Sequence, residues 1–253
     1  MKKILYCKDS LEGVFSAIYM AYELECSHSD TAIKISGNDN IELFAEYVDI
    51  LEDEDKSLKV ARTIINTFGI DCYMMICKCL ASYNEDKADS VYHMIVHGLK
   101  NKRKSNLIND LSNDFVHKVF GLGRETNNEI LHFRGFLRFE ELKNGVLFSK
   151  IHPKNNILTF LAPHFSDRLP GENFVIYDEG RQIFVIHPSN KELFVVTGDY
   201  ITDNELELSA SEEFYSDLFK EFCISIAIKE RRNISLQTQN LPLRFQKYMT
   251  EFR

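Results

Sequence analysis

The sequence predicts an α+β fold, with a largely helical N-terminal half and a mostly antiparallel sheet in the C-terminal half that is closed by C-terminal helices. Apolar residues recur three and four positions apart through the first 130 residues, as amphipathic helices require. That stretch contains no proline, whereas all five prolines lie beyond residue 150. In the second half Asn144-Gly145 separates two apolar runs, and both residues tolerate the positive φ of a hairpin turn.

The first half begins with two short strands and continues with helices. The strands are expected over 4–7 and 32–35, and the helices over 10–25, 53–68, 71–82, 87–99, 105–119 and 124–133. Asp9-Ser10 supplies an N-cap candidate for the first helix, and Gly69 a C-cap for the second. Gly121 and Gly123 predict a helix-breaking link between the last two helices.

After Gly135 short apolar runs predict a ββαβββ unit. Its strands are expected at Phe136–Phe139, Val146–Phe148, Phe174–Tyr177, Gln182–His187 and Glu192–Val196. A helix over 155–169 lies between the second and third strands, and Pro163 predicts a kink or break within it. A long helix from Ser211 through Ile228 and a last helix from about Pro242 complete the chain.

Charge and composition suggest a division into residues 1–132 and residues 133–253, either as two regions or within one compact domain. The chain has 253 residues and a net charge of −8. Residues 1–132 carry 15 basic and 21 acidic side chains and so account for most of this negative charge. Residues 133–253 are therefore nearly neutral. This balance excludes a generally basic nucleic-acid coat but leaves a local anion site possible. Since no apolar run suits a membrane span or a signal peptide, we expect a cytoplasmic protein.

The second region carries a set of arginines and histidines close to predicted strand and helix ends. Arginine donates two parallel hydrogen bonds to a phosphate or a carboxylate, so the set could converge on an anion. The alternative is ion-pair scaffolding, for example Arg181 with Asp178, or Arg168 with Asp167 or Glu172. The candidate anion-binding residues are His132, Arg134, Arg138, His152, Arg168 and Arg181.

His164 and Asp178 are the candidate catalytic pair, because a carboxylate could orient a histidine that titrates near neutral pH. The alternative is that His164 caps a helix end. No nucleophile elbow, phosphate loop or zinc-protease motif accompanies the pair. Cys72, Cys77 and Cys79 lack the paired spacing of a zinc site, so we expect them to pack in the core. We predict no metal and no cofactor.

A set of short motifs resembles a bacterial family of unknown function that is catalogued as a probable DNA metabolism protein. In the second half these are Phe136–Leu142, Ile151–Pro153, Asn155–Leu158, His164-Phe165, Arg168–Pro170, Ile176–Asp178 and Arg181. The opening Tyr6–Gly13 and the endings Glu230–Asn233, Leu241–Phe245 and Tyr248–Phe252 are also similar. The chain departs from the family in having no tryptophan, with Phe219 and Gln246 at the matching positions, which weakens any role for tryptophan in base stacking.

The resemblance implies a context rather than a mechanism. Relatives are encoded beside a radical SAM protein proposed to modify or repair DNA, and some are fused to a uracil-DNA glycosylase-like domain. The first hypothesis is therefore a DNA metabolism or repair accessory protein that works with a radical SAM partner and binds DNA or another phosphate-bearing ligand. The Arg/His set, nearby phenylalanines and the basic run Lys100–Lys104 could supply that contact.

Two alternatives come from other classes. One is an enzyme that acts on a nucleotide or a damaged base, in which His164, Asp178, Arg168 and Arg138 would converge on one pocket. The other is a non-enzymatic adaptor whose helical first half binds a protein through an exposed apolar patch on the 71–99 helices. The residues alone leave open whether the protein is an enzyme.

Overall fold

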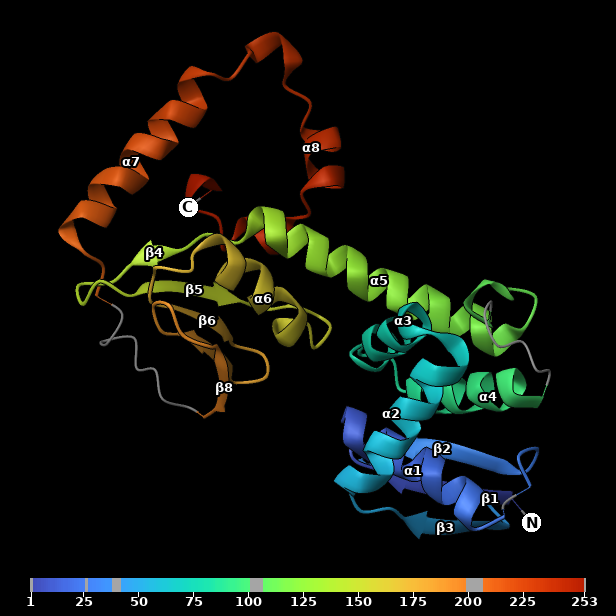
Figure 1. Ribbon diagram of the computed structural model, residues 1–253. Coiled ribbons are helices and arrows are strands. Elements are labelled where there is room, and N and C mark those ends of the chain that lie inside the picture. Colours follow the sequence, from blue (N-terminus) through green and yellow to red (C-terminus); the bar gives the residue numbers. More distant parts are fainter. Residues whose placement is uncertain (1, 26, 38–41, 101–106, 199–206, 253) are drawn as a thin grey trace. The chain divides into compact units, whose positions relative to one another are not determined.

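The computed structural model describes residues 2–25, 27–37, 42–100, 107–198 and 207–252 (Figure 1). It confirms the α+β class. The chain divides into two compact units, Met1–Asn128 and Glu129–Arg253. Gly37–Asn40 is a cluster of turn-forming residues, and most of it lies outside the described residues. The same is true of most of the basic run Lys100–Lys104. Within those residues no helix is both long enough and apolar enough to cross a membrane.

A three-stranded parallel sheet begins the N-terminal unit. Its strands are β1 (Lys2–Cys7), β2 (Thr31–Ile35) and β3 (Ala45–Asp49), in the order β2-β1-β3. The strand β3 was not predicted from the sequence. None of its residues is fully buried, so it lacks the clear alternation of apolar and polar residues that marks a half-buried strand.

Four helices complete most of this unit: α1 (Leu11–Glu23), α2 (Glu54–Phe68), α3 (Ile70–Leu80) and α4 (Lys87–Lys100). The Ser10 hydroxyl caps α1 by accepting from the Gly13 N–H at 2.9 Å, and Asp53 caps α2 by accepting from the Lys56 N–H at 3.0 Å. These helices bury one apolar core against the sheet, which includes Cys72 and Cys79 as predicted.

The helix α5 (Asp114–Phe136) is continuous, so the predicted break at Gly121 and Gly123 is wrong. A 3₁₀ turn at Leu107–Asn109 precedes it. Gly123 has a packing role instead, because a Cβ atom there would collide with Met75, whereas a Cβ at Gly121 would meet nothing within 4 Å. The strand expected at Phe136–Phe139 is also wrong, since α5 continues through Phe136.

The C-terminal unit contains the predicted ββαβββ arrangement. Its five-stranded sheet has the order β4-β5-β6-β7-β8, with three antiparallel pairs and one parallel pair, β5 with β6. Gly145 in the first hairpin has a φ of +78°. The crossover helix α6 (Leu158–Arg168) continues through Pro163 without the predicted break. The strands are Glu140–Glu141, Leu147–Ile151, Phe174–Asp178, Ile183–His187 and Phe194–Thr197.

The remaining helices are α7 (Ala210–Ser225), α8 (Ile234–Asn240) and α9 (Leu243–Gln246), with 3₁₀ turns at Lys229–Arg231 and Thr250–Phe252. Phe245 of α9 is buried in the core of this unit, with Phe133 of α5 and Phe174 of β6 in the same cluster. α7 is different, because none of its residues is buried within the described structure. The core therefore holds the C-terminal end of the chain but not α7.

Candidate functional site

Three of the predicted arginines border one cavity of the C-terminal unit, which we call the arginine cleft. It has a volume of about 260 Å³ and lies between the end of α5 and the end of α6. Arg134 is in the last turn of α5, and Arg168 ends α6. Its lining residues are Arg134, Gly135, Leu137, Arg138, Phe139, Phe165, Arg168 and Leu169.

Aromatic packing fixes the two walls of the arginine cleft relative to each other. Phe139, which follows α5, makes an edge-to-face contact with Phe165 of α6 at a centroid distance of 5.3 Å. It also contacts Phe174 of β6 at 5.4 Å. Phe133 and Phe165 are buried in the core and have no exposed ring face for a base, whereas Phe136 and Phe139 are partly exposed.

Arg138 is occupied by protein groups. Its guanidinium donates to the carbonyls of Gly135 and Leu137, at 2.9 and 3.2 Å, and so satisfies acceptors at the C-terminal end of α5. It also forms an ion pair with Glu251 at 2.7 Å. The sequence predicted that Arg138 lies on a strand, whereas it lies in the connection that follows the helix. Its charge is therefore largely neutralised within the unit.

Arg134 and Arg168 are different, because both are exposed and neither forms an ion pair or hydrogen bond with any described residue. The ion pair suggested for Arg168 with Asp167 or Glu172 is not formed among these residues. Each arginine complements the dipole of the helix that it ends, but that role leaves the guanidinium N–H groups free. The arginine cleft thus presents two uncompensated cations.

The pKa of His164 on α6 is affected by the charges of both of these arginines. Burial lowers the pKa of its imidazole below the ordinary value, and the positive charges of Arg134 and Arg168 lower it further. Its ring contacts Phe165 at a centroid distance of 5.1 Å. The imidazole is therefore neutral near pH 7, and an anion held by the two arginines would favour its protonation.

Asp178 and Arg181 form a separate, structural group. The Asp178 carboxylate is fully buried and accepts from the Gly180 and Arg181 N–H groups and from the Arg181 guanidinium, at 3.0, 3.3 and 3.1 Å. Arg181 also donates to the carbonyls of Pro153 and Lys154. Within the described residues no hydrogen bond joins Asp178 to His164. The ion pair of Arg181 with Asp178, the scaffolding alternative for these two residues, is present.

The two remaining candidates, His132 and His152, lie in other environments. His132 stacks on Phe136 of its own helix at 5.7 Å and meets the edge of Phe245 at 5.4 Å. His152 is 3.6 Å from Glu179, whose carboxylate also pairs with Lys150 and Lys247 and accepts from the Tyr248 hydroxyl. Of the sequence-predicted set, the arginine cleft therefore collects Arg134, Arg138 and Arg168, with His164 next to them.

Sequence reasoning missed Glu129, whose buried side chain joins α5 to the loop after β5 and to α9. It is only 3% exposed, accepts from the Lys154 and Asn155 N–H groups and from the Asn155 amide, and forms an ion pair with Arg244 at 3.1 Å. A glutamate followed by Ile130 and Phe133 on a helix is a signal of a buried carboxylate, but nothing in the sequence identifies its partners.

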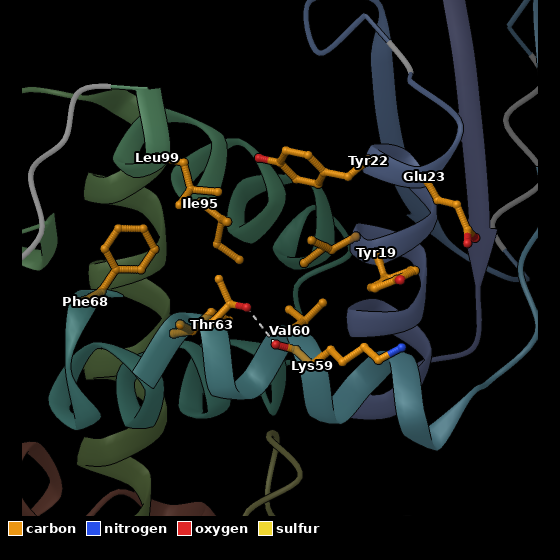
Figure 2. A pocket seen from close by; sticks show the side chains of 11 residues that line it. Tyr19, Tyr22, Glu23, Lys59, Val60, Thr63, Phe68, Ile95 and Leu99 are labelled. Atoms are coloured by element: carbon orange, nitrogen blue, oxygen red, sulfur yellow. Dashed lines mark hydrogen bonds between the residues drawn. The ribbon is translucent and has the colours of Figure 1, made fainter. Parts of the chain in front are cut away.

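A larger cavity of about 430 Å³ lies in the N-terminal unit, between α1, α2 and α4 (Figure 2). Ile18, Val60, Ile64, Phe68, Ile95 and Leu99 line it, with Tyr19, Tyr22, Glu23, Lys59 and Thr63. The volume suits a small ligand. Lys59 lies over the ring of Tyr19 at 5.5 Å, and its backbone carbonyl accepts from the Thr63 hydroxyl. Glu23 is paired with Lys56, and most of the lining is apolar or aromatic, so this cavity offers apolar shape rather than reactive chemistry.

A metal site is absent from the described residues, in which no three His, Cys, Asp or Glu side chains are grouped to hold an ion. Cys72 and Cys79 are buried, and burial raises the pKa of each thiol to about 12. Both are therefore protonated and unreactive near neutral pH.

Residues 85–251 match the family described as a domain of unknown function, DUF4130. This is about two thirds of the sequence. The chain belongs to the DUF4130 family. The match includes the arginine cleft and α7, whereas the similar opening motif Tyr6–Gly13 lies outside it. No curated protein matches the chain. The DUF4130 region thus contains every residue of the candidate site.

Proposed function

We propose that this DUF4130 protein is a DNA metabolism accessory protein that binds a phosphate of a nucleic-acid strand in the arginine cleft. The observation that carries the proposal is the pair of uncompensated guanidinium groups of Arg134 and Arg168 at one cavity. A phosphate accepts up to two parallel hydrogen bonds from each guanidinium. The partly exposed ring of Phe139 adds an apolar surface next to the anion. The resemblance to proteins of DNA metabolism supports nucleic acid as the source of the phosphate.

A binding role is favoured over catalysis by the contacts of Asp178 and Arg138. An enzyme built on His164 and Asp178 needs both side chains at one point, but the Asp178 carboxylate is fully buried and bonded to Arg181. Arg138 is paired with Glu251. The groups left to meet a ligand are cationic donors without an oriented base, which suits anion recognition.

The test is a fluorescence-anisotropy titration of the full chain with a short labelled single-stranded oligonucleotide over a range of salt concentrations. Arg134→Gln and Arg168→Gln should each weaken binding roughly tenfold, since each removes a charge-assisted hydrogen bond of about 1.4 kcal/mol. Each substitution should also make the slope of log K against log salt shallower by about 0.7, the value for one phosphate of a single strand. Arg124→Gln is the matched control, because Arg124 is an exposed arginine of the same helix α5.

Two results would remove the proposal. One is the absence of binding at low salt. The other is an equal loss of affinity in Arg124→Gln and in the two cleft variants, because a diffuse surface charge would then account for the binding. The radical SAM partner implied by the resemblance is tested separately. The two purified proteins should co-elute in size-exclusion chromatography with and without DNA, and independent elution in both conditions would count against that partnership.

A further inference from the structure

The helix α7 carries a broad apolar face that remains exposed in the described structure, although the 3₁₀ turn Thr250–Phe252 lies against the helix. At 100° per residue, six large apolar side chains lie within one arc of about 140°. Exposed fractions are 64% for Phe214, 51% for Leu218 and 53% for Phe222. The six are Phe214, Tyr215, Leu218, Phe219, Phe222 and Ile226, and all are exposed. Soluble proteins rarely leave a contiguous apolar surface of this kind open to water unless it binds something.

The orientation of α7 is the reverse of that of an ordinary surface helix. The partly buried members of the helix are Glu212, Ser216, Lys220 and Cys223, which lie outside the apolar arc. The base of the helix is fixed by polar contacts, because Glu212 accepts from the Glu141 N–H and Ser209 bonds the Glu141 carboxylate. The polar side therefore attaches to the unit, and the apolar side faces outward.

We propose that α7 is a docking helix for a protein partner that offers an apolar groove bordered by lysine or arginine side chains. Charge complementarity selects this occupant. The helix has four acidic residues, Glu212, Glu213, Asp217 and Glu221, and one basic residue, Lys220, which pairs with Asp217 at 3.5 Å. Asp217 and Glu221 lie along one edge of the apolar arc, so a matching groove is basic along that edge. The groove spans about 24 Å, the length of sixteen helical residues.

The same charges disfavour two other occupants. In an antiparallel pair of α7 helices from two copies, the acidic edges would face each other, and like charges across an interface oppose association. An anionic membrane surface also repels an acidic helix, because membrane-surface helices usually carry lysine and arginine on their polar face. A basic protein groove satisfies both the apolar arc and its acidic edge.

The probe is a synthetic amphipathic helical peptide with leucines on one face and lysines along its borders. Its fluorescence anisotropy is measured against the full chain. A second peptide has the same leucine face and glutamates at the borders. The lysine peptide should bind at least tenfold more tightly than the glutamate peptide, and its affinity should fall as salt rises. Leu218→Ser and Phe222→Ser should each weaken binding of the lysine peptide at least tenfold.

The matched control is Ile70→Ser, which removes an exposed apolar side chain from the N-terminal unit and should leave peptide binding unchanged. Circular dichroism checks that each variant is folded, and oligonucleotide binding at the arginine cleft should be unaffected by the α7 variants. Equal binding of the two peptides, no binding of either, or binding insensitive to the α7 variants would overturn the proposal. A dimer in light scattering that Leu218→Ser dissociates would also overturn it, because a second copy would then occupy the face.

Discussion

Replacement of Asp178 by alanine should destabilise the C-terminal sheet without directly altering the arginine cleft. The carboxylate lies at the end of β6, is completely buried, and accepts three hydrogen bonds from the turn that leads into β7. One of them comes from Arg181, which in turn holds the carbonyls of Pro153 and Lys154. The substitution therefore releases a turn and a loop together.

The expected magnitude follows from the geometry of this group. Removing one partner of a buried ion pair costs about 3–5 kcal/mol, because the other charge loses its compensation. Arg181 is 27% exposed and keeps two backbone acceptors, so water and those carbonyls moderate the loss. We expect about 3 kcal/mol for Asp178→Ala, at the lower end of the range for buried pairs. Asp178→Asn should cost about 2 kcal/mol, since it keeps one acceptor oxygen for the turn N–H groups.

Hydrogen exchange followed by mass spectrometry measures this loss of stability separately in each of the two units. A loss of about 3 kcal/mol should make amides of β6 and β7 exchange roughly a hundredfold faster, while peptides of β1 and α1 keep their protection. Asp167→Ala is the control, because Asp167 is exposed and such substitutions usually change stability by less than about 0.5 kcal/mol. Exchange that stays at the wild-type level while DNA binding is lost would refute a structural role for Asp178.

Three further predictions concern other groups. The pKa of His164, followed by NMR, should lie below 6.5. Because the unfolded chain then binds the proton more readily than the folded chain, protonation of this histidine lowers the stability of the folded protein as pH falls below about 6.5. Bound phosphate should raise the pKa of His164. A pKa at or above 6.5 in the free protein would contradict the proposed surroundings. Glu129→Gln should cost about 2–3 kcal/mol in urea unfolding, because the new amide N–H₂ faces groups that already donate. Gly121→Ala should stabilise the protein by about 0.5–1 kcal/mol, and Gly123→Ala should destabilise it by about 1–3 kcal/mol. The reason is that only the methyl group added at position 123 collides with Met75. Thermal unfolding that ranks the two variants in the opposite order would count against this packing.

Local sequence signals predicted most of the fold. The cap at Ser10 and the hairpin at Asn144-Gly145 each depend on residues within four positions of one another. The errors arose where a sequence pattern is compatible with more than one secondary structure. The run Phe136–Phe139 is too short to distinguish a strand from a helix end, and α5 continues into it.

The candidate site was harder to predict, because its composition depends on contacts between residues that are far apart in the sequence. Arg138 pairs with Glu251, 113 positions later in the chain, and no spacing rule identifies that partner. Arg134 and Arg168 come together because two helices end beside each other, which the residue types alone do not specify. Residue types therefore indicated the cationic chemistry of the cleft, but they grouped with it three residues, His132, His152 and Arg181, whose contacts lie elsewhere.

The single parallel pair in the C-terminal sheet has a consequence for folding order. β6, β7 and β8 are joined by short antiparallel connections, and β4 with β5 forms a hairpin, so each group can form from contacts close in sequence. The β5–β6 pair instead requires the chain of α6 to cross over and close a longer loop. We therefore expect β4–β5 and β6–β8 to form first, and the pairing of β5 with β6, which requires α6, to limit the rate of folding. Because the arginine cleft needs the end of α6 in place, it forms only at that last step.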